Sequence, residues 1–274
     1  MTYYDIKARL ASAGIDHPDV ESALLLSRFC DVGSAELLFS KQRDFDSPAL
    51  EAALARRERH EPLQYILGEW EFFGLPFEVG PDCLIPRPDT ELLCEMAISL
   101  VPKNARIADF CTGSGCIAVA VLHHRPDLAA VLVDAFEGTL SLAGRNCQRN
   151  GVQARADLVL QDLLQPLDGV FAEKFDCILS NPPYIPTEVV KGLAPELAFE
   201  PQVALDGGQD GMLFYRHFLK QSRHLLKDGG FWLFEIGYDQ EQAITAQAAA
   251  CGFACRVYRD LGGNPRVAHV YKEN

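Results

Sequence analysis

The stretch ARIADFCTGSGCIAVAVLHHR, residues 105–125, decides the fold of this chain. Its first seven residues form the mostly apolar run of a buried strand, and an apolar helix follows Gly115. A turn of small residues, TGSG, lies between the strand and the helix. A strand, a small-residue turn and a helix in this order are typical of an open α/β sheet.

Strands and helices alternate from this stretch to the end of the sequence. We expect further strands at 129–136, 156–162, 175–181 and 231–237, and helices at 139–151, 212–230 and 240–251. This alternation predicts a Rossmann-like, mostly parallel sheet with helices on both faces. The last two strands, 255–261 and 266–272, are too close together for a crossover helix, so they should form an antiparallel hairpin.

The first part of the chain has a different pattern. Apolar residues recur at spacings of three and four up to about residue 75, which predicts a small N-terminal helical bundle, domain 1–75. Ser47 is expected to cap one of its helices, with Pro48 in the first position. A β-hairpin within 68–86 should link the bundle to an α/β domain at 87–274.

Composition and charge exclude several classes of protein. The chain has 274 residues, 48% of them hydrophobic, without an apolar run of the roughly 20 residues that a membrane helix needs. Its first residues lack the apolar core of a signal peptide, so we expect a cytoplasmic protein with no membrane partner. The net charge of −13 would repel a phosphate backbone, so long nucleic acid is not an expected partner.

Nine cysteines are scattered along the chain, and none forms a C-x-x-C pair. We therefore expect reduced, mainly buried thiols rather than disulfides or a zinc site. Cys251 and Cys255 are close enough in sequence to keep a metal or redox role open.

Ligands of open α/β sheets lie beyond the carboxyl ends of the strands. In the first turn, Gly113 and Gly115 allow the backbone to approach a ligand, and Asp109 adds a carboxylate. Asp134 ends the next strand, where a ribose would present its hydroxyl groups. The turn lacks the dinucleotide spacing of glycines and better fits a nucleoside without a pyrophosphate. An ordinary tight turn and a capping aspartate are the alternatives.

The segment SNPPYIP, residues 180–186, ends another strand at the same edge. Proline lacks an N–H and fixes φ, so the chain must leave the sheet as a stiff loop that begins at Asn181. The carboxamide oxygen of Asn181 and a neighbouring proline carbonyl could accept both hydrogens of an NH₂ group. Tyr184 adds a flat face, and the alternative is a simple turn capped by Asn181.

These motifs, in this order, resemble those of S-adenosylmethionine-dependent methyltransferases that modify exocyclic or amide nitrogens. The chain is similar over nearly its whole length to the HemK-type (PrmC) release factor glutamine N5-methyltransferases. The more specific likeness lies in EPLQYILGEWEFFGLPFEVGPDCLIPRPDTELL (61–93), FEPQVALDGGQDGMLFYR (199–216) and DLGGNPRV (260–267).

The resemblance implies a class I methyltransferase domain with an N-terminal domain that docks the substrate. It implies methyl transfer from S-adenosylmethionine, leaving S-adenosylhomocysteine, to the glutamine of the Gly-Gly-Gln motif in peptide-chain release factors, without a metal. The catalytic positions implied are Asn181, Pro182, Pro183 and Tyr184. The cofactor positions implied are Asp109, Cys111, Thr112, Gly113, Ser114, Gly115, Asp134, Asp162, Leu163 and Asn181. Arg87 and Glu91 fall in a family motif near the cofactor pocket.

The chain departs from the family pattern at two positions: Cys111 stands where glycine is usual, and Leu163 where some relatives have an aromatic residue. The chain also contains Gly-Gly-Gln at 207–209, which raises self-methylation as an alternative. Four other readings stay open at this point: adenine N6 of DNA or RNA as substrate, a different protein glutamine, a nicotinamide dehydrogenase, and a binding module without catalysis.

Overall fold

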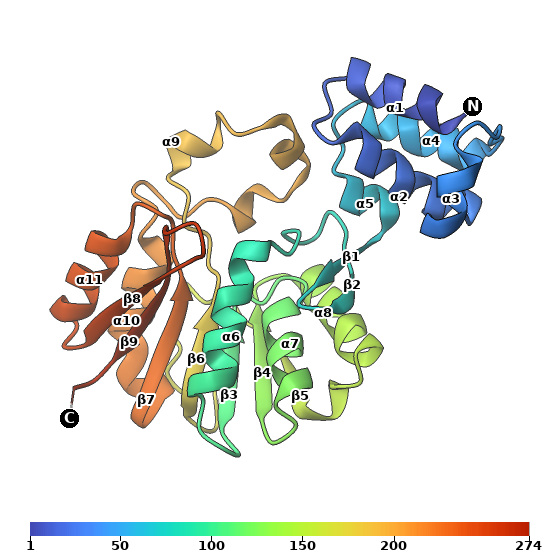
Figure 1. Cartoon of the computed structure of the whole chain (residues 1–274). Coiled ribbons are helices and arrows are strands. Elements are labelled where there is room, and N and C mark those ends of the chain that lie inside the picture. Colours follow the sequence, from blue (N-terminus) through green and yellow to red (C-terminus); the bar gives the residue numbers. More distant parts are fainter. Residues whose placement is uncertain (274) are drawn as a thin grey trace. The chain divides into compact units, whose positions relative to one another are not determined.

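The computed structural model describes residues 1–273 of the chain. Its internal contacts divide the chain into two units. The first unit is Met1–Glu69 together with the short segment Ala194–Phe199. The second unit begins with Trp70 and comprises the rest of the described chain. Figure 1 labels the elements of both.

The first unit is helical, as expected from its apolar spacing. Its helices are α1 (Tyr3–Ser12), α2 (Pro18–Cys30), α3 (Ser34–Ser40), α4 (Pro48–Arg57) and α5 (Leu63–Leu67). Leu10, Leu25 and Leu54 are fully buried between them. The Ser47 side chain accepts a hydrogen bond from the Leu50 N–H and Pro48 is the first helical residue, which confirms the predicted start of α4.

A buried arginine joins three parts of the first unit. The Arg57 guanidinium donates two hydrogen bonds to Glu21, at 2.7 and 3.1 Å. It also lies 3.5 Å from Glu196 in the segment Ala194–Phe199, where Glu196 meets His60 as well. This segment contains the 3₁₀ helix η3 (Pro195–Phe199). The contacts of Glu196 with Arg57 and His60 hold it to the helices of the first unit.

The predicted hairpin is formed by strands β1 (Glu69–Phe72) and β2 (Leu75–Glu78), and all of it after Glu69 belongs to the second unit. Phe73 in its turn has a left-handed backbone, with φ of 53°. The Phe73 N–H donates to the Glu91 carboxylate at 3.1 Å. Glu91 is the first residue of α6 (Glu91–Leu100), so it fastens the turn of the hairpin to this helix.

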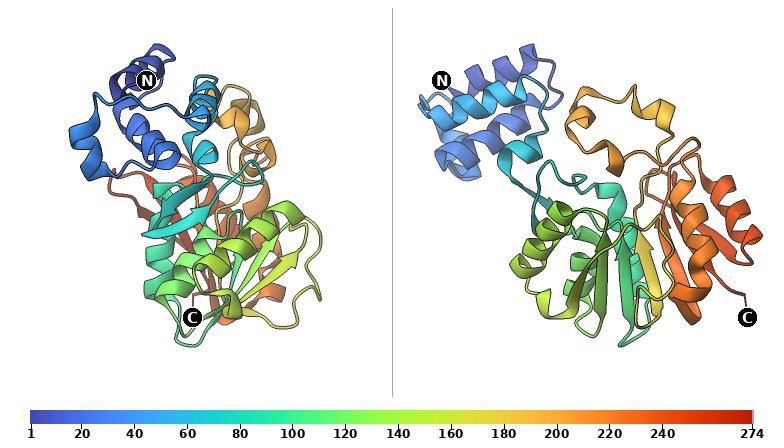
Figure 2. Two further views of the ribbon diagram at one scale, coloured as in Figure 1. Left: turned by 90° about the vertical axis from the view of Figure 1, so that its right-hand side faces the viewer. Right: turned by 180° about the vertical axis from the view of Figure 1, so that it is seen from behind.

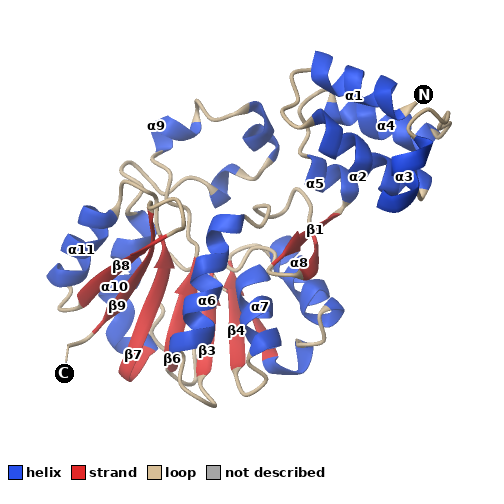
Figure 3. Cartoon of the chain, viewed as in Figure 1, coloured by secondary structure: helices blue, strands red, loops and turns tan. Residues whose placement is uncertain are grey.

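A seven-stranded sheet forms the centre of the second unit (Figure 3). In spatial order its strands are β5 (Ala156–Leu160), β4 (Ala129–Asp134), β3 (Arg106–Phe110), β6 (Phe175–Ser180), β7 (Leu226–Glu235), β9 (Pro265–Tyr271) and β8 (Ala254–Arg259). The first five pair in parallel, and β8 and β9 pair antiparallel, as predicted.

Helices cover both faces of this sheet, which confirms the predicted α/β class (Figures 1 and 2). One apolar core is shared by α6, α7 (Cys116–His124) and α8 (Glu137–Arg149). The other is shared by α10 (Leu213–Leu225) and α11 (Glu241–Ala250), with Trp232 stacked against Phe218 and Phe234. Strand residues alternate between the two cores, with Ile107 on one face and Ala108 on the other.

The prediction of one helix over 212–230 was wrong at its end. Helix α10 stops at Leu225, and the following KDGG sequence belongs to β7. The pairing of β7 with β6 shifts register here, because Phe175 faces Leu226 while Cys177 faces Phe231. Gly229 takes a φ of 77°, which a helix does not allow.

The remaining short elements lie mainly in loops: η1 (Pro88–Thr90), η2 (Gln153–Arg155), α9 (Thr187–Val190) and η4 (Gln202–Ala204). All nine cysteines are free, and five of them are buried. Among residues 1–273, no helix has the length and apolar character that crossing a membrane requires.

Candidate functional site

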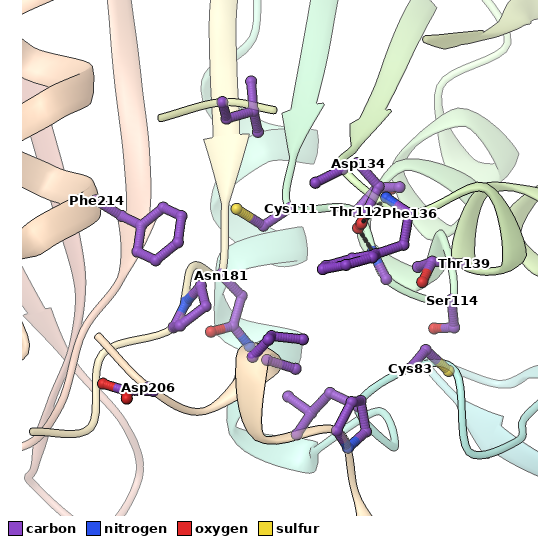
Figure 4. Close-up of a pocket in the computed structure, with 18 of the residues that line it drawn as sticks. Cys83, Cys111, Thr112, Ser114, Asp134, Phe136, Thr139, Asn181, Asp206 and Phe214 are labelled. Carbon is purple, nitrogen blue, oxygen red and sulfur yellow. Dashed lines mark hydrogen bonds between the residues drawn. The ribbon is translucent and has the colours of Figure 1, made fainter. Parts of the chain in front are cut away.

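A cavity of about 620 Å³ opens at the carboxyl ends of β3, β4 and β6, in the second unit. In Figure 4, Phe214 and Asn181 lie on one side of this space, and Asp134, Phe136 and Thr139 lie on the other. Its lining is mainly apolar with a few convergent polar groups, as is usual for sites that bind small organic molecules.

The turn after β3 brings bare backbone to the cavity. Cys111 and Gly113 both have left-handed backbones, with φ of 58° and 57°. A Cβ on Gly113 would meet no atom within 4 Å, so its missing side chain leaves room on the cavity side. Gly115 serves packing instead, because a Cβ there would come within 3.2 Å of Ala143 in α8. The left-handed conformation of Cys111 costs about 1 kcal/mol that a glycine would not.

Two buried carboxyl groups lie under this turn. Asp134 accepts from the Gly113 N–H at 3.1 Å and from the Phe136 N–H at 3.3 Å. Asp109 accepts from the Thr112 hydroxyl at 2.7 Å and from the Ala118 N–H at 3.2 Å, both through Oδ2. Burial raises the pKa of Asp134, and it raises the pKa of Asp109 to about 7. A cationic ligand nearby would stabilise the charged form of both carboxyl groups, which burial disfavours.

Asn181 follows the end of β6 and reaches the cavity. Its Nδ2 donates to the Thr90 hydroxyl oxygen at 3.3 Å. Because Nδ2 is engaged there, the carboxamide presents Oδ1 as an acceptor. Tyr184 lies further back, where its hydroxyl donates to the Glu235 carboxylate at 3.4 Å.

Glycines and a glutamine hold the backbone of the Asn-Pro-Pro-Tyr segment. A Cβ on Gly207 would lie 2.7 Å from the Pro183 carbonyl oxygen, and one on Gly211 would lie 2.2 Å from that of Tyr184. The Gln240 side chain donates to the Tyr184 carbonyl at 3.0 Å. The Gly-rich segment at 206–211 is thus part of the support of this site, and Gly207 of the chain's own Gly-Gly-Gln packs against the Asn-Pro-Pro-Tyr backbone.

Arg87 and Glu91, two residues of one motif, have separate positions. Arg87 lines the cavity and pairs with the buried carboxylate of Glu200. The same carboxylate accepts from the Ile85 N–H at 3.0 Å, which holds the segment 82–87 along the cavity. Glu91 binds the hairpin turn and is not among the described residues that line the cavity.

The structure brings most of the predicted site residues together. The lining includes Cys111, Thr112, Gly113, Ser114, Asp134, Asp162, Leu163, Asn181 and Pro183. Among the described residues, Asp109, Gly115, Pro182 and Tyr184 lie outside that lining. Reasoning from the sequence missed Cys83, Thr90, Phe136, Thr139, Asp206 and Phe214. Phe136 could have been found, since it follows Asp134 by two residues at the end of β4.

The cavity suits a nucleoside that carries a positive charge. Asp134 can accept from ribose hydroxyls, and Leu163 and Phe136 offer apolar contact to a base. Asp109 Oδ1 and the Ser114 hydroxyl are buried without a partner in the described part of the chain. Over residues 1–273, no three His, Cys, Asp or Glu side chains gather as a metal site would require.

Comparisons with known proteins agree with this geometry. Residues 89–226 match the model of the methyltransferase small domain, and residues 4–68 match that of the PrmC N-terminal domain. A release factor glutamine methyltransferase of Geobacter sulfurreducens is 39% identical over 263 residues, covering 94% of this chain and 91% of that protein. The enzyme of the same name from Moorella thermoacetica is 38% identical over 273 residues, covering 96% and 95%.

Among solved structures, a methyltransferase from Pyrococcus furiosus matches the fold with a TM-score of 0.55 and 20% identity, over 73% of this chain and 89% of that one. The sheet order and the cavity at the strand ends thus define a class I S-adenosylmethionine-dependent methyltransferase domain. With its N-terminal helical region included, the chain belongs to the family of release factor glutamine methyltransferases.

Replacing Gly207 by alanine should displace the Asn-Pro-Pro-Tyr backbone. The added Cβ would lie 2.7 Å from both the Pro183 oxygen and the Tyr184 Cα, and neither backbone atom can move aside easily. We expect kcat to fall about tenfold or more, and affinity for S-adenosylhomocysteine to change by less than about threefold. Steady-state kinetics and calorimetry measure the two effects.

Gly192→Ala is the matched control for this variant. It lies in the same excursion between β6 and α10, and its Cβ would come no closer than 3.8 Å to the Val189 oxygen. Gly192→Ala should keep wild-type kcat. Wild-type kcat in Gly207→Ala would show that the Gly-rich segment does not determine the position of the Asn-Pro-Pro-Tyr segment.

The raised pKa of Asp109 makes the second unit less stable as pH rises. Unfolded, this carboxyl ionises near its usual 3.8, and folded near 7, so unfolding releases a proton between these values. Over that range its contribution to the free energy of unfolding falls by roughly 1.4 kcal/mol per pH unit. Glu235, with its pKa raised by burial to about 7, adds to the same slope.

Asp109→Asn should remove one of these two contributions. The test is urea unfolding without ligand at pH 5, 6 and 7. Both tryptophans, Trp70 and Trp232, lie in the second unit, so their fluorescence reports its unfolding. An unchanged slope in Asp109→Asn would mean that Asp109 is ionised in the folded protein.

Proposed function

We propose that this chain transfers a methyl group from S-adenosylmethionine to the side-chain amide nitrogen of the glutamine in the Gly-Gly-Gln motif of peptide-chain release factors. The observation that carries the proposal is the carboxamide of Asn181. Its Nδ2 is engaged by Thr90, so its oxygen can accept from a substrate amide at the cavity. Membership of the family supplies the substrate class.

An amide nitrogen is a weak nucleophile, because its lone pair is delocalised into the carbonyl. Asn181 Oδ1 and the Pro182 carbonyl are proposed to accept the two hydrogens of the substrate NH₂ and so fix the nitrogen. Both hydrogen bonds strengthen as positive charge grows on that nitrogen. Fixing two reactants in line can contribute on the order of 7 to 11 kcal/mol in ideal cases.

S-adenosylmethionine supplies an electrophilic methyl group on a sulfonium and leaves as S-adenosylhomocysteine. We propose that the turn at 111–115 holds its amino-acid part and that Asp134 holds the ribose. Asp162 and Leu163 are proposed to border the adenine, where Leu163 gives apolar contact without aromatic stacking. The substrate nitrogen gains the methyl carbon and loses a proton to water, and no metal takes part.

The helical unit is proposed to dock the release factor, because a short Gly-Gly-Gln loop offers little surface for recognition. Release factors act in the cytoplasm, where we place this protein. The charge of −13 disfavours long nucleic acid as a substrate.

The substrate is tested with labelled S-adenosylmethionine and three acceptors: a purified release factor, its Gly-Gly-Gln glutamine→alanine variant, and an adenine-rich oligonucleotide. We expect label in the unmodified release factor alone. Label in the oligonucleotide alone would overturn the substrate but retain nitrogen methylation. Label in none would contradict the proposed function for release factors.

Asn181→Ala should separate catalysis from cofactor binding. Loss of one preorganised hydrogen-bond partner typically costs 10²- to 10³-fold in kcat, so we expect a fall of about 100-fold. The affinity for S-adenosylhomocysteine should change by less than about threefold, since other residues hold it. Kinetics at saturating cofactor decide the matter, and a kcat near that of the wild type would exclude Asn181 from the mechanism.

A further inference from the structure

An arginine in β9 joins the C-terminal hairpin to the segment that precedes α6. Arg266 is 9% exposed, and its Nη2 lies 3.0 Å from the Asp89 carboxylate and 3.2 Å from that of Asp260. Asp89 belongs to η1, the short helix that leads into α6, and Asp260 lies in the turn between β8 and β9. One guanidinium therefore bridges two segments that are far apart in the sequence.

The sheet and the turn hold this arginine in place. The Arg266 carbonyl accepts from the Ile236 N–H at 2.9 Å, at the carboxyl end of β7. Asp260 is itself fixed, because its carboxylate accepts from the Asn264 N–H at 2.9 Å and its own N–H donates to the Asn264 carbonyl at 3.0 Å. A guanidinium keeps its proton in proteins. Arg266 is thus a permanent charge at the edge of the sheet where the cavity opens.

The helix η1 ends at the candidate site. Thr90, its last residue, is 2% exposed, lines the cavity and accepts from Asn181 Nδ2 at 3.3 Å. Asp89 directly precedes Thr90, so the ion pair with Arg266 and the hydrogen bond with Asn181 are one residue apart. A helix of three residues has little stability of its own. Contacts from outside η1 therefore determine where Thr90 lies.

We propose that Arg266 is a positioning residue: its ion pair with Asp89 fixes η1, so that Thr90 holds the Asn181 carboxamide with its oxygen toward the substrate amide. The inference rests on the proposed methyl transfer and deepens it. A carboxamide whose Nδ2 has lost its partner can rotate and present NH₂ in place of its oxygen, so that two donors face each other. Neither Arg266 nor Asp89 is among the described residues that line the cavity, so both act through Thr90.

Asp89→Asn removes the charge of the ion pair with little change of shape. The Asp89 side chain is 54% exposed, so this variant should fold. Without the pair, η1 is held less firmly and Thr90 engages Asn181 for only part of the time. We expect kcat to fall about fivefold or more, while the KM for S-adenosylmethionine changes by less than about threefold. Arg266→Met should lower kcat at least as much, and Asp89→Asn remains the deciding variant if the buried methionine impairs folding.

Glu241→Gln is the matched control, because it makes the same chemical change in another ion pair of the same hairpin. Glu241 pairs with Arg259 at 2.5 Å, and its side chain is 40% exposed. This ion pair holds α11 and not η1, so Glu241→Gln should keep kcat within about twofold of the wild type. An equal loss of kcat in Glu241→Gln and Asp89→Asn would contradict a specific role of Arg266.

A double-mutant cycle tests whether Asp89 acts through Thr90. Thr90→Val keeps the volume and removes the hydroxyl that receives the Asn181 hydrogen bond, so it should lower kcat at least as much as Asp89→Asn. In the Thr90→Val background, Asp89→Asn should change kcat by less than about twofold. Effects of independent residues would instead multiply, so a further loss of about fivefold would show that Asp89 does not act through Thr90.

Hydrogen exchange of the Asn181 side-chain NH₂, followed by NMR, does not depend on activity. The signal is identified by its loss in Asn181→Ala. Because Thr90 protects this group in the wild type, we expect exchange about threefold faster or more in Asp89→Asn and unchanged exchange in Glu241→Gln. A wild type that methylates no acceptor would refute the proposed function alone, and the exchange rates would still test the positioning role. Equal exchange in the wild type and Asp89→Asn, or a kcat in Asp89→Asn within about twofold of an active wild type, would overturn that role.

Discussion

The backbone after β6 contains two prolines in a row, and the candidate site depends on how other segments hold it. Neither Pro182 nor Pro183 has an N–H to donate, so the sheet ladder cannot continue through them. Support comes from outside the strand: Gln240 binds the Tyr184 carbonyl, and the backbone of Gly207 packs directly on Pro183. The stiffness of the segment thus has two sources, the proline rings and close contact with glycine backbone.

Burial of polar groups gives the site its electrostatic character. Asp109 and Glu235 are fully buried within one unit, and their pKa values are raised for the same reason, the loss of water around the charged form. Their surroundings differ, however. Asp109 has neutral donors from Thr112 and Ala118, whereas Glu235 lies near the cation of Arg266. A cationic cofactor would supply near Asp109 the positive charge that Arg266 supplies near Glu235.

The local sequence was sufficient to predict much of the fold and of the candidate site. Strand–turn–helix units are short, so the turn after β3, Asp134 at the end of β4 and Asn181 after β6 could be located from apolar patterns alone. The end of α10 could not be located in this way, because the KDGG sequence belongs to β7 only through the pairing of β7 with β6. The contact of Thr90 with Asn181 and that of Glu235 with Tyr184 could not be predicted either. Thr90 is 91 residues from Asn181, and Glu235 is 51 residues from Tyr184, so only the packed fold brings them together.

Three stretches carry the more specific likeness to the family, and in the structure charged groups of two of them, Glu200 and Asp260, fix other segments. Glu200 holds the segment 82–87 through the Ile85 N–H and Arg87, although 115 residues separate Glu200 from Ile85. Asp260 pairs with Arg266, and Arg266 also pairs with Asp89, which directly precedes Thr90 of the cavity lining. In each case a charged group away from the reacting atoms fixes a segment that borders them. Residues of this kind can be essential to the site without lining it, because they determine where its donors and acceptors point.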